Sequence, residues 1–231
     1  MNEASRILSE VLKEGRKSLL EIEAKTICTE YGIPVARSEL AKTPDEAVKL
    51  AKSIGFPVVL KIVSPDIIHK SDSGGVIIDL KDEKQVLHGF NQVLENTKRH
   101  NPKAKIIGVL VQEMAKPSTE VIIGAIRDPQ FGPAVMFGLG GVFVEVLKDV
   151  SFRVAPITED DAREMISDVK AYPLLKGYRN TPPSDINEIA EILVNVSKLV
   201  MDHSEIEELD LNPVIVYEKG AKAVDARIIL Q

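Results

Sequence analysis

The sequence has no tryptophan, one cysteine and few aromatic residues, which make up 4% of its 231 positions. A hydrophobic core must therefore be built from isoleucine, valine, leucine and alanine side chains. The single cysteine, Cys28, excludes an intramolecular disulfide and fits a reducing cytoplasm. No apolar run approaches the roughly 20 residues that span a membrane, and the N-terminal stretch lacks the apolar core of a signal peptide. We therefore expect a cytoplasmic protein with no membrane partner.

Positive charge and the commonest nucleotide-binding motifs are also scarce. The formal net charge of −6 argues against nucleic acid as a partner, because binding to a phosphate backbone needs a basic surface. The sequence contains neither GxxxxGK followed by Ser or Thr nor GxGxxG, so any bound nucleotide must be held in another way. The hydrophobic content of 44% and the length allow one domain or two closely packed subdomains.

Periodicity and capping residues predict the local structure. Apolar residues recur at helical spacing in six stretches, and Thr43 and Gly55 are a suitable cap and stop for one of them. The predicted helices cover residues 3–14, 18–31, 45–54, 82–96, 160–168 and 184–203. Short apolar runs predict strands over residues 58–63, 76–80, 106–112, 120–126, 134–137, 142–147, 151–154 and 206–216. Further extended segments are expected near residues 33–40 and 223–227.

The stretch from residue 56 to residue 79 has the composition of an anion-binding loop between two strands. Lys61 lies in an apolar run, and a buried ammonium group costs several kcal/mol unless an anion or a carboxylate contacts it. Gly74 and Gly75 allow positive φ angles and a close approach of backbone amides to a phosphate. His69 can act as a base or a nucleophile near neutral pH. The alternatives are a structural ion pair of Lys61, a simple glycine turn and a polar loop histidine.

A second stretch, near the C-terminus, has the composition of a metal site. On a strand, Glu208, Asp210 and Asn212 share one face, while the leucines between them face the other side. Oxygen-bearing side chains in a row repel one another, and a hard cation removes this repulsion. Asp225 on the next strand could lie beside Asn212 and complete a set of oxygen ligands for Mg²⁺. The alternative is an edge strand with a solvated face.

Taken together, these segments resemble a known family. The chain looks like an ATP-grasp domain, and most closely like the nucleotide-binding β subunit of ADP-forming acetyl-CoA synthetases, which are related to succinyl-CoA synthetase. The resemblance is carried by VVLKIVSPDIIHKSDSGGV at 58–76, VQEMAKPSTEVIIGAIRDPQFGP at 111–133, FGLGGVFVEVLKDVSFRVAP at 137–156, LDLNPV at 209–214 and VDARI at 224–228.

The resemblance implies an α/β (α+β) fold in which two ATP-grasp subdomains with mixed or antiparallel sheets grip a nucleotide between them. We expect an N-terminal helical segment over residues 1–34, a first subdomain over 35–110 and a second over 111–231.

The same resemblance implies roles for individual residues. Lys61 would contact the nucleotide phosphates, and Gly140 and Gly141, with Glu145 and Asp149, would border them. Glu113 and Met114 would meet the adenine through backbone groups, and Glu120 would bind the ribose hydroxyls. Asn212 and Asp225 match the magnesium ligands, with Asp210 as a weaker candidate, and His69 matches a histidine that is transiently phosphorylated.

The implied reaction is acyl-CoA + ADP + phosphate = acid + CoA + ATP, with Mg²⁺ as cofactor and ATP or ADP as substrate. An α subunit would carry the CoA and acyl sites, so the implied enzyme is an acid-thiol ligase assembled as a hetero-oligomer such as α2β2. Two alternatives stay open: a stand-alone ATP-grasp ligase that forms an acyl phosphate, and a regulatory module that binds ATP without turnover.

Overall fold

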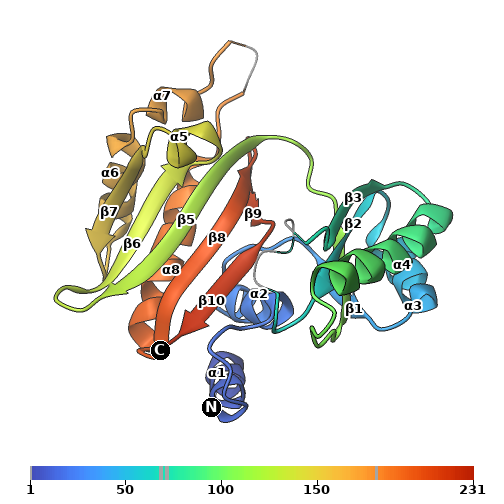
Figure 1. Ribbon diagram of the computed structural model, residues 1–231. Helices are drawn as coiled ribbons and strands as arrows, with labels where there is room; N and C mark the ends of the chain where they lie inside the picture. Colours follow the sequence, from blue (N-terminus) through green and yellow to red (C-terminus); the bar gives the residue numbers. More distant parts are fainter. Residues whose placement is uncertain (1, 68–69, 71–72, 180–181) are drawn as a thin grey trace. The chain divides into compact units, whose positions relative to one another are not determined.

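The computed structural model describes residues 2–67, 70, 73–179 and 182–231 (Figure 1). Its contacts divide the chain into two compact units. Unit 1 comprises Met1–Leu19, Glu23–Val35 and Lys116–Gln231, and unit 2 comprises Leu20–Ile22 and Ala36–Ala115. The chain passes between the units more than once. The helix Glu21–Glu30 is divided between them, since its first two residues belong to unit 2 and the remainder to unit 1.

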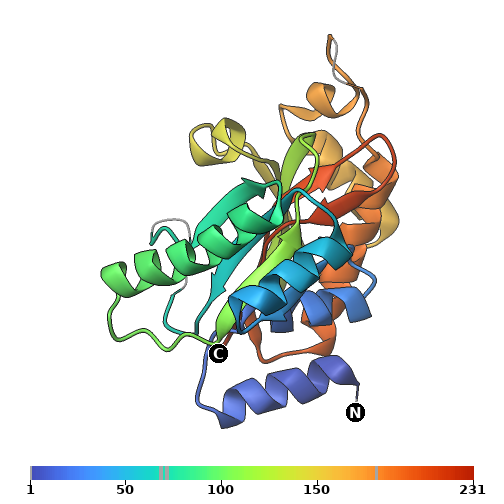
Figure 2. The same cartoon turned by 90° about the vertical axis from the view of Figure 1, so that its right-hand side faces the viewer.

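Unit 2 is a four-stranded antiparallel sheet with two helices on one face. The strands are β1 (Ser38–Ala41), β2 (Val58–Val63), β3 (Val76–Leu80) and β4 (Gly108–Glu113), in the order β1-β4-β2-β3. Helices α3 (Pro44–Ile54) and α4 (Glu83–His100) lie on this face (Figure 2). They bury Ala51, Phe90 and their neighbours against β2 and β4.

Both helices of unit 2 begin at a side-chain cap. The hydroxyl of Thr43 accepts a hydrogen bond from the Glu46 N–H at the start of α3. The carboxylate of Asp82 accepts one from the Gln85 N–H at the start of α4. These bonds satisfy amide groups that a helix leaves without a partner, so the predicted starts of both helices are confirmed to within a residue.

Unit 1 is built on a larger antiparallel sheet of β5 (Thr119–Asp128), β6 (Gly132–Leu139), β7 (Val150–Val154), β8 (Ile206–Val216), β9 (Ala221–Ala223) and β10 (Ala226–Leu230). The strand order is β10-β8-β5-β6-β7, and β9 also pairs with β8. Its helices are α1 (Glu3–Lys13), most of α2 (Glu21–Glu30), α5 (Val142–Glu145), α6 (Glu159–Asp168), α7 (Tyr172–Leu175) and α8 (Ile186–Asp202).

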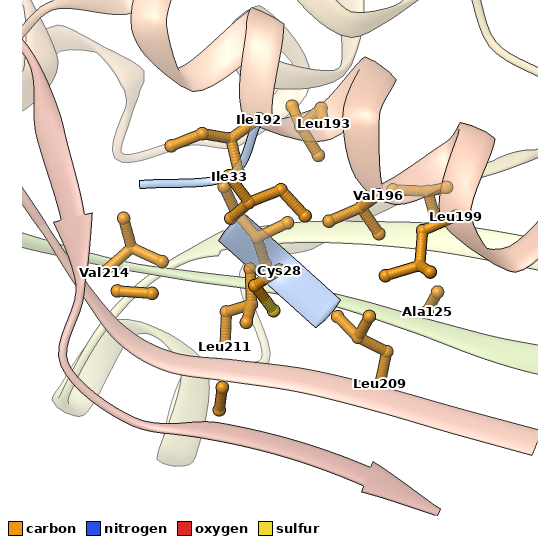
Figure 3. Packing of buried hydrophobic residues seen from close by; sticks show 14 of the residues in the cluster. Cys28, Ile33, Ala125, Ile192, Leu193, Val196, Leu199, Leu209, Leu211 and Val214 are labelled. Carbon is orange, nitrogen blue, oxygen red and sulfur yellow. The ribbon is translucent and has the colours of Figure 1, made fainter. Parts of the chain in front are cut away.

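The core of unit 1 lies between its sheet and its helices. Cys28 of α2 is fully buried, and Figure 3 shows it among aliphatic side chains of β8 and α8. Burial raises the pKa of the Cys28 thiol to about 12, because the thiolate would lose its hydration. The expected core of aliphatic residues is thus confirmed, and Cys28 serves as a small core residue. The labelled neighbours are Ile33, Ala125, Ile192, Leu193, Val196, Leu199, Leu209, Leu211 and Val214.

The structure corrects the prediction for residues 142–147. A strand was expected there, but Val142–Glu145 form the short helix α5. The Val144 N–H donates to the Gly141 carbonyl and the Asp149 N–H donates to the Phe143 carbonyl. These local bonds close a compact turn before β7, so the β-branched residues do not form a strand.

The described residues contain no helix that is both long and apolar enough to cross a membrane. All strand pairs among these residues are antiparallel, and the one parallel contact is an isolated bridge between Val35 and Ala223.

Candidate functional site

The candidate site residues fall into two sets, one in each unit. In unit 2, Lys61 lies in the middle of β2, paired with Val76 of β3 and Leu110 of β4. Its neighbours Leu60 and Ile62 face the helices, so the lysine projects from the opposite face of the sheet. The Lys61 Nζ is 2.8 Å from Oε1 of Glu21, which confirms that the buried ammonium group has a carboxylate partner.

A second lysine contacts the same carboxylate. The Lys70 ammonium group donates to Oε2 of Glu21, so each carboxylate oxygen binds one lysine. Only 2% of the Glu21 side chain is exposed, against 6% for Lys61 and 16% for Lys70. We call these three residues the cationic cluster. It places two ammonium groups close together, which is the chemistry that phosphate oxygens require.

The glycine turn after the loop is tied to this cluster by backbone hydrogen bonds. The Gly75 N–H donates to the Lys70 carbonyl at 2.8 Å, and the Gly75 carbonyl accepts from the Ile62 N–H at 2.7 Å. A Cβ atom at position 75 would lie 2.6 Å from Cγ2 of Ile62, so only glycine fits. Gly74 adopts a φ of 63°, a positive angle that glycine, without a side chain, can take. The Gly75 amide is thus used within the chain rather than presented to a ligand.

His69 lies outside the described residues, as do its neighbours Ile68, Ser71 and Asp72. The structure describes Lys70, which follows the histidine directly, and the turn from Ser73 to Gly75.

The candidate adenine-binding residues occupy the end of β4. The Glu113 N–H donates to the Arg37 carbonyl at 2.9 Å, and the Glu113 carboxylate accepts from the Arg37 N–H at 2.8 Å. The Met114 N–H donates to the Pro57 carbonyl at 3.2 Å. Both amides therefore already have acceptors inside unit 2, so a contact with adenine would most simply use backbone carbonyl groups.

In unit 1, Glu120 and Gly140 line a common pocket of about 240 Å³. The Gly140 N–H donates to the Glu120 carbonyl at 2.8 Å. A Cβ on Gly140 would lie 3.0 Å from Cβ of Glu120, so glycine permits the close approach of the two strands. The sequence did not single out the apolar walls of this pocket, which have no charge or motif to reveal them. The other lining residues are Thr119, Leu139, Phe143, Leu174 and Tyr178.

The remaining candidate residues near the second glycine loop are Gly141, Asp149 and Glu145. Gly141 adopts a φ of 63°. Asp149 is buried, and its carboxylate accepts hydrogen bonds of 2.8 Å from the Lys170 and Ala171 amides. Its oxygens therefore hold a neighbouring turn of unit 1, and we assign it no ligand. The side chain of Glu145 is not described.

The acidic residues of β8 lie on one face of the strand, as predicted. Leu209 and Leu211 are buried in the core, whereas Glu208 and Asp210 are half-buried and Asn212 is exposed. Desolvation raises the pKa of Asp210, and the negative charges of Glu208 and Asp225 raise it further, against the opposing effect of Arg227.

Asp225 lies beside Asn212, also as predicted. It stands in the short link between β9 and β10, which both pair with β8. The Val224 N–H donates to the Pro213 carbonyl, and Ala226 is in register with Leu211, so Asp225 falls opposite Asn212. We call Glu208, Asp210, Asn212 and Asp225 the acidic edge.

The acidic edge has donors suited to a hard cation. Its groups are carboxylate and amide oxygens, which Mg²⁺ prefers. Among the described residues no group of three or more His, Cys, Asp or Glu side chains is arranged to hold a metal ion. Mg²⁺ usually keeps several waters and binds through one or two carboxylates plus phosphate oxygens, and Asp225 with Asn212 fits that mode.

Comparison with known proteins gives the family. A model of the family described as "ATP-grasp domain" matches residues 10–230. The chain therefore belongs to the ATP-grasp domain family, and the fold expected from the resemblance is confirmed.

The similarity to individual proteins extends over nearly the whole chain. The beta subunit of ADP-forming acetate-CoA ligase II from Pyrococcus furiosus is 53% identical, and the match covers 99% of this chain and 98% of that subunit. A structure of acetyl-coenzyme A synthetase 1 from Ca. Korarchaeum cryptofilum, in complex with coenzyme A, Ca-AMPCP and HgCl+, matches with a TM-score of 0.97 and 55% identity, over 99% of this chain and 100% of that one.

A second structure of the Korarchaeum enzyme contains coenzyme A and Mg-AMPPCP, and its phosphohistidine segment points towards the nucleotide binding site. It matches with a TM-score of 0.88 and 52% identity, over 99% of this chain and 100% of that one.

Proposed function

We propose that this chain is the nucleotide-binding β subunit of an ADP-forming acyl-CoA synthetase. The reaction is acyl-CoA + ADP + phosphate = acid + CoA + ATP, and the phosphoryl group reaches ADP through His69. The observation that carries this proposal is the 53% identity, over 99% of the chain, to the beta subunit of an ADP-forming acetate-CoA ligase. The cationic cluster and the acidic edge supply the chemistry that such a reaction needs.

The cationic cluster supplies positive charge to the nucleotide phosphates. Lys61 neutralises charge on the nucleotide phosphates, and its ammonium group is held at a fixed place by Glu21. Gly74 and Gly75 shape the turn that follows the loop. Glu113 and Met114 bind the adenine through backbone carbonyls, since their amides have acceptors in unit 2.

The other candidate residues lie in unit 1. Glu120 binds the ribose hydroxyls from the pocket that it shares with Gly140, and Gly141 continues the wall along the phosphates. Asn212 and Asp225 would hold Mg²⁺ by side-chain oxygens, and Asp210, two residues before Asn212 on the same face of β8, would support them. Magnesium, when bound, neutralises charge on the phosphate oxygens.

The transfer step is a substitution at phosphorus. A terminal oxygen of ADP forms a bond to the phosphorus of phosphorylated His69, the N–P bond breaks, and the electron pair stays on the imidazole nitrogen, which takes a proton from solvent. Imidazole is both a good nucleophile and a good leaving group, so the same residue can accept and deliver the phosphoryl group.

The proposal requires a partner. The Pyrococcus relative is called a subunit, and we propose that an α subunit with the CoA and acyl sites completes the enzyme, as an α2β2 assembly in the cytoplasm. A stand-alone ATP-grasp ligase would turn over without this partner. A regulatory module would bind ATP without becoming phosphorylated.

The test is to incubate the purified chain with Mg²⁺ and γ-labelled ATP. We expect acid-labile, base-stable label on the wild-type chain and on His88→Ala, a matched control on the exposed face of α4, and none on His69→Ala. ATP binding without label on the wild type would contradict the proposal and favour the regulatory module. Equal label on His69→Ala would remove this histidine from the mechanism.

A further inference from the structure

Glu21 is a buried acid that no sequence motif singles out, and its contact with Lys61 is only part of what it touches. It is the first residue of α2, where the positive end of the helix dipole favours a carboxylate. Its two oxygens contact two different lysines of unit 2, 40 and 49 residues further along the chain. The carboxylate is therefore a bridge between two ammonium groups rather than half of a single ion pair.

Stability alone is a poor explanation for such a bridge. Removing charges from water costs several kcal/mol per ion, and buried ion pairs can often be replaced by apolar residues without loss of stability. The cross-strand partners of Lys61 are Val76 and Leu110, so an aliphatic residue at position 61 would have an aliphatic neighbour on each adjoining strand. The cluster thus indicates that Glu21 holds the two ammonium groups in position.

Lys70 is held by its backbone as well as by its side chain. Its carbonyl accepts hydrogen bonds from the Gly75 N–H at 2.8 Å and from the Ser73 hydroxyl at 2.9 Å, while its ammonium group contacts Glu21. In the sequence, Lys70 directly follows His69, the residue of the proposed transfer.

We propose that Glu21 is a positioning residue for phosphoryl transfer. Its carboxylate holds the Lys61 ammonium group where nucleotide phosphates bind, and it holds Lys70 and thereby one end of the segment that carries the phosphorylated histidine. The inference rests on the proposed function, because it assigns Glu21 to the same transfer. Glu21 does not touch the reacting atoms and acts through the two lysines.

The experiment compares the initial rate of labelling by γ-labelled ATP in four variants of the full chain. Glu21→Gln keeps the size of the side chain and removes its charge, Lys70→Gln removes the other partner of the Glu21–Lys70 contact, and the double variant combines the two changes. Glu23→Gln is the matched control, because Glu23 is a neighbouring acid on α2 that pairs with Arg16 in unit 1. Thermal unfolding and the dissociation constant for Mg-ATP are measured for each variant.

We expect Glu21→Gln and Lys70→Gln each to slow labelling by about 10- to 100-fold, the loss that a misplacement of about 1 Å can cause. The double variant should be no slower than the slower single variant, because both changes break the same contact. The dissociation constant for Mg-ATP should change much less than the rate. Glu23→Gln should label at the wild-type rate.

Labelling of Glu21→Gln at the wild-type rate would overturn the inference, and so would effects of the two single changes that multiply in the double variant. A loss of Mg-ATP binding as large as the loss of rate would also overturn it, since Glu21 would then serve nucleotide binding alone. These failures differ from failure of the proposed function, in which the wild-type chain itself takes no label. Lys70→Gln alters a partly exposed side chain and keeps the test valid if Glu21→Gln does not fold.

Discussion

The cationic cluster of unit 2 and the acidic edge of unit 1 differ in how their charged side chains are arranged and buried. In the cluster, one carboxylate contacts two ammonium groups, and all three side chains are buried or nearly so. At the acidic edge, carboxylates and an amide share one face of β8, and three of the four side chains are half-buried. At the edge, desolvation and the charges of Glu208 and Asp225 raise the pKa of Asp210, although Arg227 pairs with Glu208. In the cluster, both oxygens of the single carboxylate contact ammonium groups.

The difference indicates how each site meets its ligand. The cluster is arranged in advance, because its positive groups are held by a buried carboxylate whether or not a phosphate is present. The acidic edge instead carries repulsion that a cation from solvent would relieve. Variants of the cluster should therefore alter phosphate binding or phosphoryl transfer, whereas variants of the edge should alter the requirement for Mg²⁺.

The largest effect is expected at His69, which precedes Lys70 of the cluster in the sequence. His69→Ala should lower ATP formation from acyl-CoA, ADP and phosphate by about 1,000-fold or more, measured with the α subunit present, because the nucleophile is lost. His88→Ala should leave the rate within about twofold. A similar rate for His69→Ala and wild type would show that the phosphoryl group takes another route.

The next largest effect is expected at the acidic edge. Asp225→Ala should raise the Mg²⁺ concentration needed for half-maximal labelling by about 10-fold or more, because a charged ligand is removed. Lys61→Gln should weaken Mg-ATP binding instead and leave the Mg²⁺ dependence at saturating nucleotide unchanged. Asp160→Asn, at an exposed site on α6, is the control. The same Mg²⁺ dependence in Asp225→Ala and wild type would contradict the assignment of Asp225 as a magnesium ligand.

A smaller effect concerns the turn that joins the glycines to the cluster. Gly75→Ala should lower the free energy of unfolding by about 1–3 kcal/mol, because the new Cβ would overlap Ile62, and it should also slow labelling by displacing Lys70. Gly15→Ala, at a φ of 69° with open space around it, should cost about 1–2 kcal/mol without slowing the labelling of folded protein. Equal labelling rates for folded Gly75→Ala and Gly15→Ala would show that the turn at Gly75 does not affect phosphoryl transfer.

The smallest effect concerns stability and pH. The pKa of Asp210 is raised in the folded state, so the folded protein binds more protons than the unfolded chain between the two pKa values, and stability falls as pH rises through that range. Asp210→Asn should therefore raise the unfolding temperature at pH 7 without Mg²⁺ by about 1–3 °C. The gain should vanish below the ordinary pKa of an aspartate. A lower unfolding temperature at pH 7 would contradict the repulsion at the acidic edge.

The sequence predicted those parts of the sites that depend on local pattern. The alternation of β8 placed Glu208, Asp210 and Asn212 on one face, and the short link before β10 placed Asp225 beside Asn212. The burial of Lys61 predicted that it needs a partner, but not which one. Glu21 lies 40 residues earlier, and only the return of the chain from α2 to the sheet of unit 2 brings it there.

Other features depend on contacts that no local pattern contains. The alternating valines of residues 142–147 are typical of a strand, yet hydrogen bonds to Gly141 and Phe143 close a helical turn there. The walls of the pocket around Glu120 come from distant segments, so no local pattern identifies Leu174 or Tyr178 as lining residues.

The central claim is that the phosphoryl group on this chain passes to ADP. The chain would be labelled with γ-labelled ATP, freed of nucleotide, and mixed with ADP and Mg²⁺, and the label would be followed over a single turnover. We predict that it leaves the protein and appears in ATP in equal amount. Label that stays on the protein in the presence of ADP, or that is released only as inorganic phosphate, would contradict the account.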